Sequence, residues 1–480
     1  MNSDIASRIL SQTTLDASGP FLAFAIGVLL LVFLELFRAL QPLRSVVFLA
    51  TLAAAAWAAT RTMFGPELSV FEGTYVANST TSSWSLLFVA TTLIAWAFGR
   101  KYYREEAHLE GEHDILLLTA ASGMVLMAGS RDLLVFFVGL ETLSVPLYAL
   151  AGFRRSRRES VEAGLKYFVL GSFAAAIYLM GAAFVYAGTG TLQLSGIQAR
   201  SDLLEQPLAI TGVAMLVAAI FFKISVFPFH LWVPDVYQGA PSPVTTFMAT
   251  GTKAAAFAFL LPLAFALPVQ SAGLIAAIAL LTMAAGNLAA LVQTDMKRLL
   301  AYSGIAHAGT MLLAIAGIFT DPELGGASQA ILFYMAAYTF TAGGAFGLLT
   351  MLEAQTGKPV TIESLRGLAQ KRPGIAAALT LFMLSLGGIP ATGGFLGKYL
   401  IFSVAVRGDM IPAAIIGILL SVVALGYYLR IVVAMYMQSE SETQTIPAES
   451  RPLASAMALV CAAMVLVLGV LPGWFLTNVR

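Results

Sequence analysis

Cysteine is almost absent from this chain of 480 residues, and the single one, Cys461, lies in an apolar run near the C-terminus. One cysteine permits no disulfide within the chain, no CxxC pair and no cluster of thiolate metal ligands. Any redox cofactor that works with this chain is therefore expected on another chain. The sequence also lacks a metal-ligand cluster of other residue types, a nucleophile triad and a glycine-rich phosphate loop.

Charge is scarce as well: only 11% of the residues are charged, whereas 59% are hydrophobic, and the mean hydropathy is +0.84. This composition excludes an ordinary soluble domain. The net charge of +1 and the absence of a basic tract give no indication of nucleic-acid binding. Alternating polar and apolar residues, the mark of a strand, are missing. The polar N-terminus has no apolar core of a removable signal peptide. We therefore expect an all-α, multi-pass membrane protein.

About fourteen apolar segments are long enough to form one membrane helix each. They lie at 21–37, 45–60, 83–99, 114–129, 132–151, 163–188, 208–233, 243–267, 271–292, 299–319, 327–352, 374–403, 411–437 and 451–473. If the N-terminus starts outside, most Lys and Arg residues of the connecting loops fall on the inside. The most basic of these loops, residues 152–160, lies on that side, as the positive-inside rule requires.

Residues 221–259 combine costly features in otherwise apolar sequence, because Lys223, His230 and Lys253 lie within it. Three prolines interrupt the same stretch: Pro228, Pro234 and Pro241. A Lys near the centre of a bilayer costs roughly 2.5–3.5 kcal/mol, and a Pro inside a helix costs about 3 kcal/mol. A lipid-facing anchor needs neither feature. We interpret these residues as facing the interior of a helical bundle, where they handle protons or ions.

Glu141, Lys166 and Lys398 are further charged residues that fall within apolar segments. Glu141 lies near the middle of its segment, where a carboxylate is expensive unless a cation pairs with it. It could simply lie near a helix end or hold two helices together. The expected partner is Lys166, because the short loop 152–160 makes the two helices antiparallel neighbours. A carboxylate that moves toward or away from a buried lysine would switch that lysine between holding and releasing a proton.

Each of these residues also has a simpler interpretation. A single Lys can extend along the helix to the membrane surface, although this is harder to accept for several lysines together. His230 and His307 could relay protons, since histidine titrates near neutral pH, but His307 could equally be a packed polar residue. Lys297 could be an ordinary basic residue at the inside edge or a gate at a channel mouth.

Two polar segments divide the bundle. Residues 353–373 are expected to form a surface linker with one short amphipathic helix, whose apolar positions Ile362, Leu365 and Leu368 face the membrane. Residues 438–450 form an acidic loop. One apolar segment in each half is broken by a proline, Pro228 in the first and Pro390 in the second. This is a weak sign of an internal repeat of two inverted five-helix units.

The expected organisation has four parts. Residues 1–113 form three N-terminal helices, 114–268 a first half, 269–437 a second half, and 438–480 a loop and a final helix.

Several motifs together resemble one known family. They are GLETLSVPLYAL, EAGLKYFVLGSF, FKISVFPFHLWVPDVYQGAPSPVTTFMATGTKAAAF, QTDMKRLLAYSGIAHAG and GGIPATGGFLGKYLIF. They are similar to the proton-translocating, antiporter-like subunits of bacterial NADH-quinone oxidoreductase, respiratory complex I. The resemblance covers residues 114–405, and the N-terminal hundred residues carry no matching motif.

The resemblance implies two inverted five-helix bundles, with discontinuous seventh and twelfth spans. It implies that quinone reduction elsewhere in the complex drives proton pumping through this chain in the bacterial inner membrane. NADH, FMN, iron-sulfur clusters and quinone would be bound by partner subunits and none by this chain, whose own partners would be lipid and other membrane-arm subunits. It also implies roles for the charged residues: Glu141 and Lys166 as a pair, Lys223 as the switching lysine, Lys253 as the connection and Lys398 in the exit half-channel.

Two rival functions remain open on the sequence alone. Multisubunit cation/proton antiporters and membrane-bound hydrogenases share the fold, and neighbouring genes of either kind would favour them. A free-standing transporter of a small solute would need a polar pocket at mid-membrane depth. The inventory of lysines with few Ser, Asn or Asp partners argues against that pocket.

Overall fold

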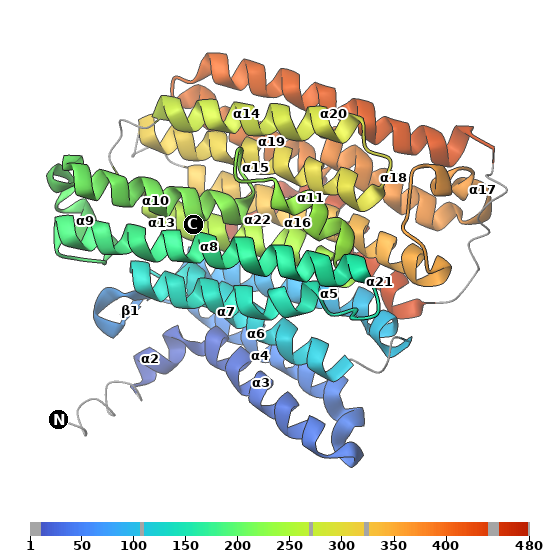
Figure 1. Ribbon diagram of the computed structural model, residues 1–480, viewed down its shortest axis with the longest axis horizontal. Helices are drawn as coiled ribbons and strands as arrows, with labels where there is room; N and C mark the ends of the chain where they lie inside the picture. The colour runs from blue at the N-terminus through green and yellow to red at the C-terminus, as the bar shows by residue number, and fades with distance from the viewer. Residues whose placement is uncertain (1–10, 106–109, 268–271, 321–325, 440–450, 479–480) are drawn as a thin grey trace.

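The computed structural model describes residues 11–105, 110–267, 272–320, 326–439 and 451–478. Helices make up nearly all of it, and most lie side by side in one bundle (Figure 1). The one sheet among the described residues is a hairpin of β1 (Leu68–Val70) and β2 (Tyr75–Ala77), which are antiparallel. The expected all-α fold is confirmed, and this hairpin is a small addition to it.

Twelve helices of the described chain are long and apolar enough to cross a membrane. Eleven of these spans each correspond to one α-helix: α3 (Gly19–Leu36), α4 (Arg44–Met63), α5 (Ser79–Glu105), α7 (Leu133–Ala151), α8 (Arg158–Thr189), α10 (Pro207–Ile224), α14 (Ala272–Leu291), α15 (Met296–Thr320), α16 (Ala327–Thr356), α20 (Ile411–Met437) and α21 (Pro452–Val470). The twelfth joins α12 (Ser242–Phe247), the π-helical turn η4 (Met248–Thr252) and α13 (Lys253–Ala266).

The other two expected segments correspond to α6 (Glu110–Gly129) and to the pair α18 (Pro373–Gly387) and α19 (Gly393–Arg407). The first carries three acidic residues in its first five positions, and the second is broken. The count of fourteen therefore stays a prediction. Short helices complete the described chain: α2 (Gln12–Ala17), η1 (Arg38–Leu43), η2 (Phe71–Gly73), α9 (Leu194–Gln198), η3 (Ser201–Glu205), α11 (Trp232–Gly239), η6 (Glu363–Leu365), α17 (Leu368–Lys371) and α22 (Pro472–Asn478).

Small residues let the helices approach closely, as membrane bundles require. At the contact of α8 with α10, a Cβ added to Gly181 would lie 2.8 Å from the Gly212 carbonyl oxygen. A Cβ on Gly212 would lie 2.7 Å from the Gly181 carbonyl oxygen. In the most apolar part of α15 and of α16, 94% of the residues are buried inside the protein. In the corresponding part of α8, α20 and α21, only 33% are buried. Lys223, Lys253 and Lys398 lie in buried parts of the bundle.

Two apolar segments are broken, as expected. The helix α10 ends at Ile224, Ser225 has a φ of +69°, and α11 begins at Trp232. In the second case α18 ends at Gly387, Gly388 has a φ of +83°, and α19 begins at Gly393. Proline cannot continue a helix without losing a hydrogen bond, and each gap contains one, Pro228 and Pro390. The inverted relation of the two halves stays a prediction.

The proposed divisions of the chain are only partly visible. The boundary between 113 and 114 falls inside α6 (Glu110–Gly129), whereas α20 ends at residue 437 as proposed. The boundary between 268 and 269 lies outside the described residues, as does most of the acidic loop 438–450.

The expected surface helix in residues 353–373 is wrong. The helix α16 continues to Thr356, and the segment after it contains only a 3-10 turn, η6, and the four-residue helix α17. Leu365 and Leu368 are buried in the protein core and do not face lipid. Backbone bonds tie the segment to the start of α15, since Met296 N donates to the Val360 carbonyl oxygen at 2.9 Å. Apolar residues at every third position fit packing on protein as well as packing on a membrane.

Candidate functional site: buried lysines and a charged cavity

Four of the predicted lysines are buried inside the protein. Lys253 is 0% exposed, and Lys223, Lys297 and Lys398 are each exposed by less than a tenth. The ammonium groups of Lys223, Lys253 and Lys398 therefore do not extend to the membrane surface. Lys166 differs, because 41% of its side chain is exposed.

Lys223 lies in the last turn of α10, directly before the helix break. Its Nζ donates to Ser144 Oγ at 2.7 Å and to the Tyr167 hydroxyl at 3.1 Å. Ser144 lies on α7 three residues after Glu141, on the same face of that helix. Glu141 interacts electrostatically with Lys223. The structure therefore brings together a buried lysine, two hydroxyls and the predicted carboxylate.

Lys166 pairs with other acids than expected. Its Nζ lies 2.8 Å from Glu162 Oε1 and 2.9 Å from Asp235 Oδ2. These are the carboxylates that contact it within the described chain, so the expected pair with Glu141 is wrong. The two helices are neighbours as predicted, but Lys166 points toward α11, which also packs on α8.

Lys253 comes directly after the π-helical turn η4. Its Nζ has no hydrogen-bond partner among the described residues. The ammonium lies 5.8 Å from the ring centroid of Tyr237 and 5.9 Å from that of Tyr338, within the range of cation–π attraction. A π-helical turn inside an α-helix frequently marks a functional position, and no sequence pattern indicates this one.

His307 and Lys398 lie together in the second half. His307 Nδ1 is 2.6 Å from the Tyr334 hydroxyl, and Nε2 is 3.2 Å from the Tyr428 hydroxyl. Lys398 Nζ donates to the Gly387 carbonyl oxygen, at the end of α18, at 3.2 Å. Both side chains line a cavity of about 10 Å³, with room for about one water molecule.

His230 lies between α10 and α11, in the broken part of the span. Its ring stacks on Phe227 with the centroids 5.6 Å apart. Its Nδ1 is buried and has no hydrogen-bond partner among the described residues. The structure does not join His230 to a lysine, and its relay role stays a prediction.

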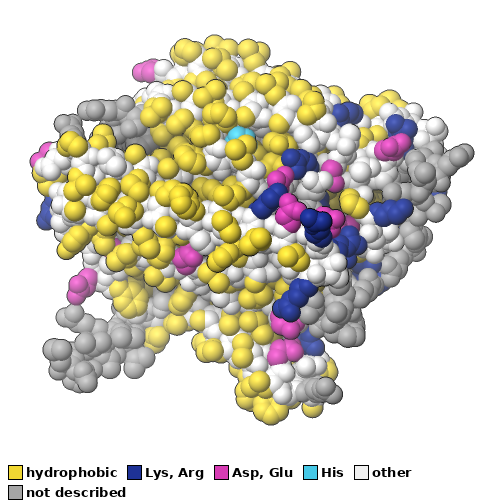
Figure 2. Space-filling model, viewed as in Figure 1, with side chains coloured by type: hydrophobic (Ala, Val, Ile, Leu, Met, Phe, Trp, Pro, Cys, Tyr) yellow, Lys and Arg dark blue, Asp and Glu magenta, His cyan; other side chains and the backbone are white. Residues whose placement is uncertain are grey.

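Charged side chains gather around a cavity of about 440 Å³ at one end of the bundle, which we call the charged end (Figure 2). The charged residues that line it are Arg154, Arg157, Glu159, Glu162, Lys166, Asp235, Lys297 and Glu353. Asp235 connects two helices here, because its carboxylate also accepts from Arg298 Nη1 of α15 at 2.6 Å. Basic loop 152–160 contributes to this end, which the charge pattern of the sequence predicts to be on the inside.

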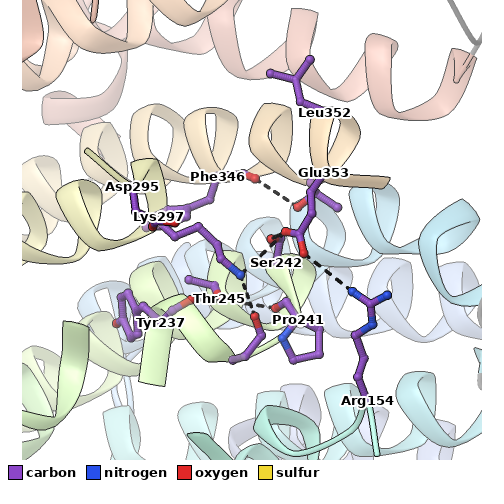
Figure 3. A network of polar contacts seen from close by, with 12 residues as sticks. Arg154, Tyr237, Pro241, Ser242, Thr245, Asp295, Lys297, Phe346, Leu352 and Glu353 are labelled. Atoms are coloured by element: carbon purple, nitrogen blue, oxygen red, sulfur yellow. Dashed lines mark hydrogen bonds and ion pairs between the residues drawn. The ribbon is translucent and has the colours of Figure 1, made fainter. Parts of the chain in front are cut away.

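Glu353 is the centre of a second network at the charged end, drawn in Figure 3. Its Oε1 lies 3.7 Å from Arg154 Nη1, and its Oε2 lies 3.7 Å from Lys297 Nζ. Ser242 Oγ donates to Oε2. Lys297 Nζ also donates to the Ala240 carbonyl oxygen at 2.8 Å.

Sequence reasoning misses both Glu353 and Asp235. It assigns Glu353 to a polar linker, and only the position directly after an apolar run could have placed this residue in the last turn of α16. Asp235 lies beside the prolines of the broken span, and nothing in its immediate sequence marks it as a partner of Lys166.

A third charged cluster joins the N-terminal helices to α6, and sequence reasoning misses it too. Arg44 Nε lies 3.0 Å from Glu35 Oε1, and its Nη1 lies 3.3 Å from Glu110 Oε2. Arg100 Nη1 lies 3.6 Å from Glu110 Oε1 and 3.7 Å from Asp114 Oδ2. Pairing of this kind is what buried charges require.

Residues 130–424 match the family described as NADH:quinone oxidoreductase/Mrp antiporter, transmembrane. The chain belongs to this family. Among curated members, it is 38% identical to NADH-quinone oxidoreductase subunit N of Myxococcus xanthus, over 95% of this chain and 94% of that protein. It is 40% identical to subunit N of Salinibacter ruber, over 87% of this chain and 85% of that protein.

Two solved structures agree with the fold. A chain of respiratory complex I from Thermus thermophilus is 37% identical, with a TM-score of 0.81 over 95% of this chain and 98% of that one. A chain of the Mrp complex from a Dietzia species has a TM-score of 0.82 at 22% identity, over 97% of this chain and 96% of that one. The second likeness concerns the fold alone. Among the described residues, no group of three His, Cys, Asp or Glu side chains could hold a metal ion.

Proposed function

We propose that the chain is the N-type membrane subunit of a bacterial NADH:quinone oxidoreductase and translocates protons across the plasma membrane. The relatives that carry this name match most of the chain at about 40% identity. The subunit would act within a larger enzyme, whose partner subunits bind NADH, FMN, iron-sulfur clusters and quinone. Its own contribution would be the proton step.

One observation carries the proposal: three buried lysines each lie at an irregularity of a helix. Lys223 precedes the break after α10, Lys253 comes after the π-helical turn, and Lys398 bonds the last carbonyl of α18. Burying an ammonium within the membrane is expensive, so such residues are generally functional. Helix irregularities free carbonyl groups that can stabilise a proton on its way.

The chain's own residues suggest how Lys223 exchanges a proton. Its ammonium donates to the hydroxyls of Ser144 and Tyr167, which hold it in place in the charged state. The negative charge of Glu141 stabilises that state further. At an effective dielectric constant of 20, the attraction between two unit charges falls from about 4 kcal/mol at 4 Å to about 2 kcal/mol at 8 Å. A movement of Glu141 could therefore offset a membrane potential of 100 mV, which is worth about 2.3 kcal/mol per charge.

In the second half, His307 would pass a proton between Lys253 and Lys398. Its two ring nitrogens contact the hydroxyls of Tyr334 and Tyr428, so the ring is held in one orientation. A histidine in such a position can accept a proton on one nitrogen and release another from the opposite one. The small cavity shared with Lys398 has room for a water molecule to complete the step.

A multisubunit cation/proton antiporter or a membrane-bound hydrogenase is the second candidate. The fold of an Mrp complex chain favours it, at 22% identity. The identity of 37% to a chain of complex I favours the first candidate. The genes that neighbour this one would distinguish the two, since each complex needs its own set of partner subunits.

The substitution Lys223→Ala tests the proposal. We expect NADH-driven proton pumping by membrane vesicles to fall by about 100-fold, the low end of what a positioned proton-transfer group contributes. Lys358→Ala is the matched control, because Lys358 is exposed in the segment after α16. Assembly of the complex is followed by native gel electrophoresis. Equal losses in both variants, or none in Lys223→Ala, would rule out the proposed role of this lysine.

A further inference from the structure

Glu353 occupies an unfavourable place for a carboxylate. It lies in the last turn of α16, where the helix dipole is negative, and its side chain is almost fully buried. The position therefore destabilises the helix, and the contacts that the carboxylate makes must supply the compensating stability. These contacts reach three other parts of the chain: Arg154 after α7, Ser242 at the start of α12 and Lys297 at the start of α15.

The carboxylate holds its two cations loosely. Both ion pairs of Glu353 are 3.7 Å long, which is beyond hydrogen-bond length. The short contact of Lys297 is with the Ala240 carbonyl oxygen, at 2.8 Å. Glu353 thus attracts the ammonium of Lys297 without a hydrogen bond of its own to it, and the ammonium stays against the backbone that joins α11 to α12.

Contacts along the backbone of α11 connect Lys297 at the cavity of the charged end with the surroundings of Lys253. Lys297 lines the cavity together with Ala240 and Pro241. Tyr237, three residues before Ala240, is buried, and its hydroxyl has no partner among the described residues. The ring of Tyr237 is in turn the one that Lys253 Nζ approaches at 5.8 Å. Figure 3 shows the side chains of Lys297 and Glu353 pointing toward each other from separate helices, with Tyr237 to one side.

We propose that Glu353 is a positioning residue that closes the cavity of the charged end, by holding Lys297 across the route from that cavity to Lys253. The inference deepens the proposed proton translocation and rests on it. We call this arrangement of Glu353 and Lys297 the gate. While Lys297 is held across the route, its fixed positive charge repels incoming protons. When the attraction of Glu353 is weakened, Lys297 leaves the Ala240 carbonyl and the route opens.

Arg154 extends the closure to the neighbouring loop. Besides its contact with Glu353, it donates to the Tyr102 hydroxyl of α5 at 2.7 Å. Arg157 of the same loop donates to the Gly357 carbonyl oxygen, just after α16, at 3.0 Å. The loop 152–158 is thereby fastened to the end of α16, which joins the first half of the chain to the second at the charged end.

The test uses membrane vesicles that contain the whole complex with Glu353→Gln. The amide keeps the shape and can still accept from Ser242, but it loses the charge that attracts Lys297. We expect NADH oxidation within about twofold of the original rate, fewer protons pumped per NADH, and a rise of about tenfold in passive proton leak. That rise corresponds to about 1.4 kcal/mol of lost closed-state stability.

Glu363→Gln is the matched control, because Glu363 is exposed and its ion pair within the described chain is with its neighbour Arg366, at 3.8 Å. Glu353→Asp keeps the charge and should leak less than Glu353→Gln. If Glu353→Gln equals Glu363→Gln in leak and in protons per NADH, the gate is disproved. If Glu353→Gln fails to assemble, Ser242→Ala, which removes only the hydroxyl donor to Glu353, decides by the same two readouts.

The outcomes separate this inference from the proposed function. If the unaltered complex pumps protons and Lys223→Ala does not, the function stands whatever Glu353→Gln shows. If the unaltered complex pumps none, the proposed function fails first.

Discussion

Gly304 of α15 lies where two polar side chains of the buried centre converge. A Cβ added at this position would lie 2.6 Å from Lys253 Nζ and 2.7 Å from the Tyr338 hydroxyl. Both distances are shorter than real contacts allow, so at least one group would have to move. The ammonium would move first, because it is the end of a flexible side chain, whereas the Tyr338 ring is packed in the core.

We therefore predict that Gly304→Ala lowers NADH-driven proton pumping about tenfold, equal to about 1.4 kcal/mol, in a complex that still assembles. Gly304→Ser adds the same Cβ together with a hydroxyl that can accept from the ammonium, so its loss should be smaller. Gly426→Ala is the control, since its Cβ would meet its nearest neighbour at an ordinary 3.4 Å. Unchanged pumping in Gly304→Ala would contradict the importance of the position of Lys253.

At the scale of helices, the break between α18 and α19 determines where the side chain of Lys398 lies. Gly388 ends α18 with a φ of +83°, a conformation in which a side chain is strained. A Cβ there would also lie 3.0 Å from Lys398 Cδ and 3.4 Å from its Nζ. The same glycine therefore allows the break and makes room for the lysine beyond it.

Gly388→Ala should cost about 1–2 kcal/mol in stability from the left-handed backbone alone, and it should also displace Lys398. We expect a lower midpoint of thermal unfolding of the purified complex and reduced pumping. The control is Gly374→Ala in the first turn of α18, where an added Cβ meets nothing within 4 Å. A complex with Gly388→Ala that is as stable and active as the control would contradict this account of the break.

Among the features of the helices, the sequence predicts the breaks but not the directions of the side chains or the π-helical turn. Prolines mark both breaks, because a missing N–H is a local property. The direction of a side chain around a helix is not local, and this is why the sequence pairs Lys166 with Glu141 although the side chain faces Asp235. The π-helical turn before Lys253 depends on packing across several helices, so no local pattern indicates it.

Over the whole molecule, the family resemblance of residues 114–405 agrees with the family match over 130–424. The N-terminal helices carry no motif, yet structural likeness to a complex I chain extends over 95% of the chain. Their attachment is electrostatic as well as apolar, through Arg44 between Glu35 and Glu110. Such pairs join residues far apart in sequence, and the order of residues alone does not reveal them.

Under the proposed function, each half of the chain handles protons at a buried lysine, Lys223 in the first half and Lys398 in the second. In this proposal Glu141 is the carboxylate whose charge influences Lys223, and the proposed switch depends on that negative charge. Glu141→Gln removes that charge while keeping the size of the side chain.

The most direct test measures NADH-driven proton uptake by membrane vesicles that carry Glu141→Gln, with assembly of the complex checked alongside. If the complex assembles while pumping and NADH oxidation both fall, the result agrees with a switch between Glu141 and Lys223. If the assembled complex pumps at the original rate, Glu141 has a structural role only, and the switch between carboxylate and lysine is contradicted.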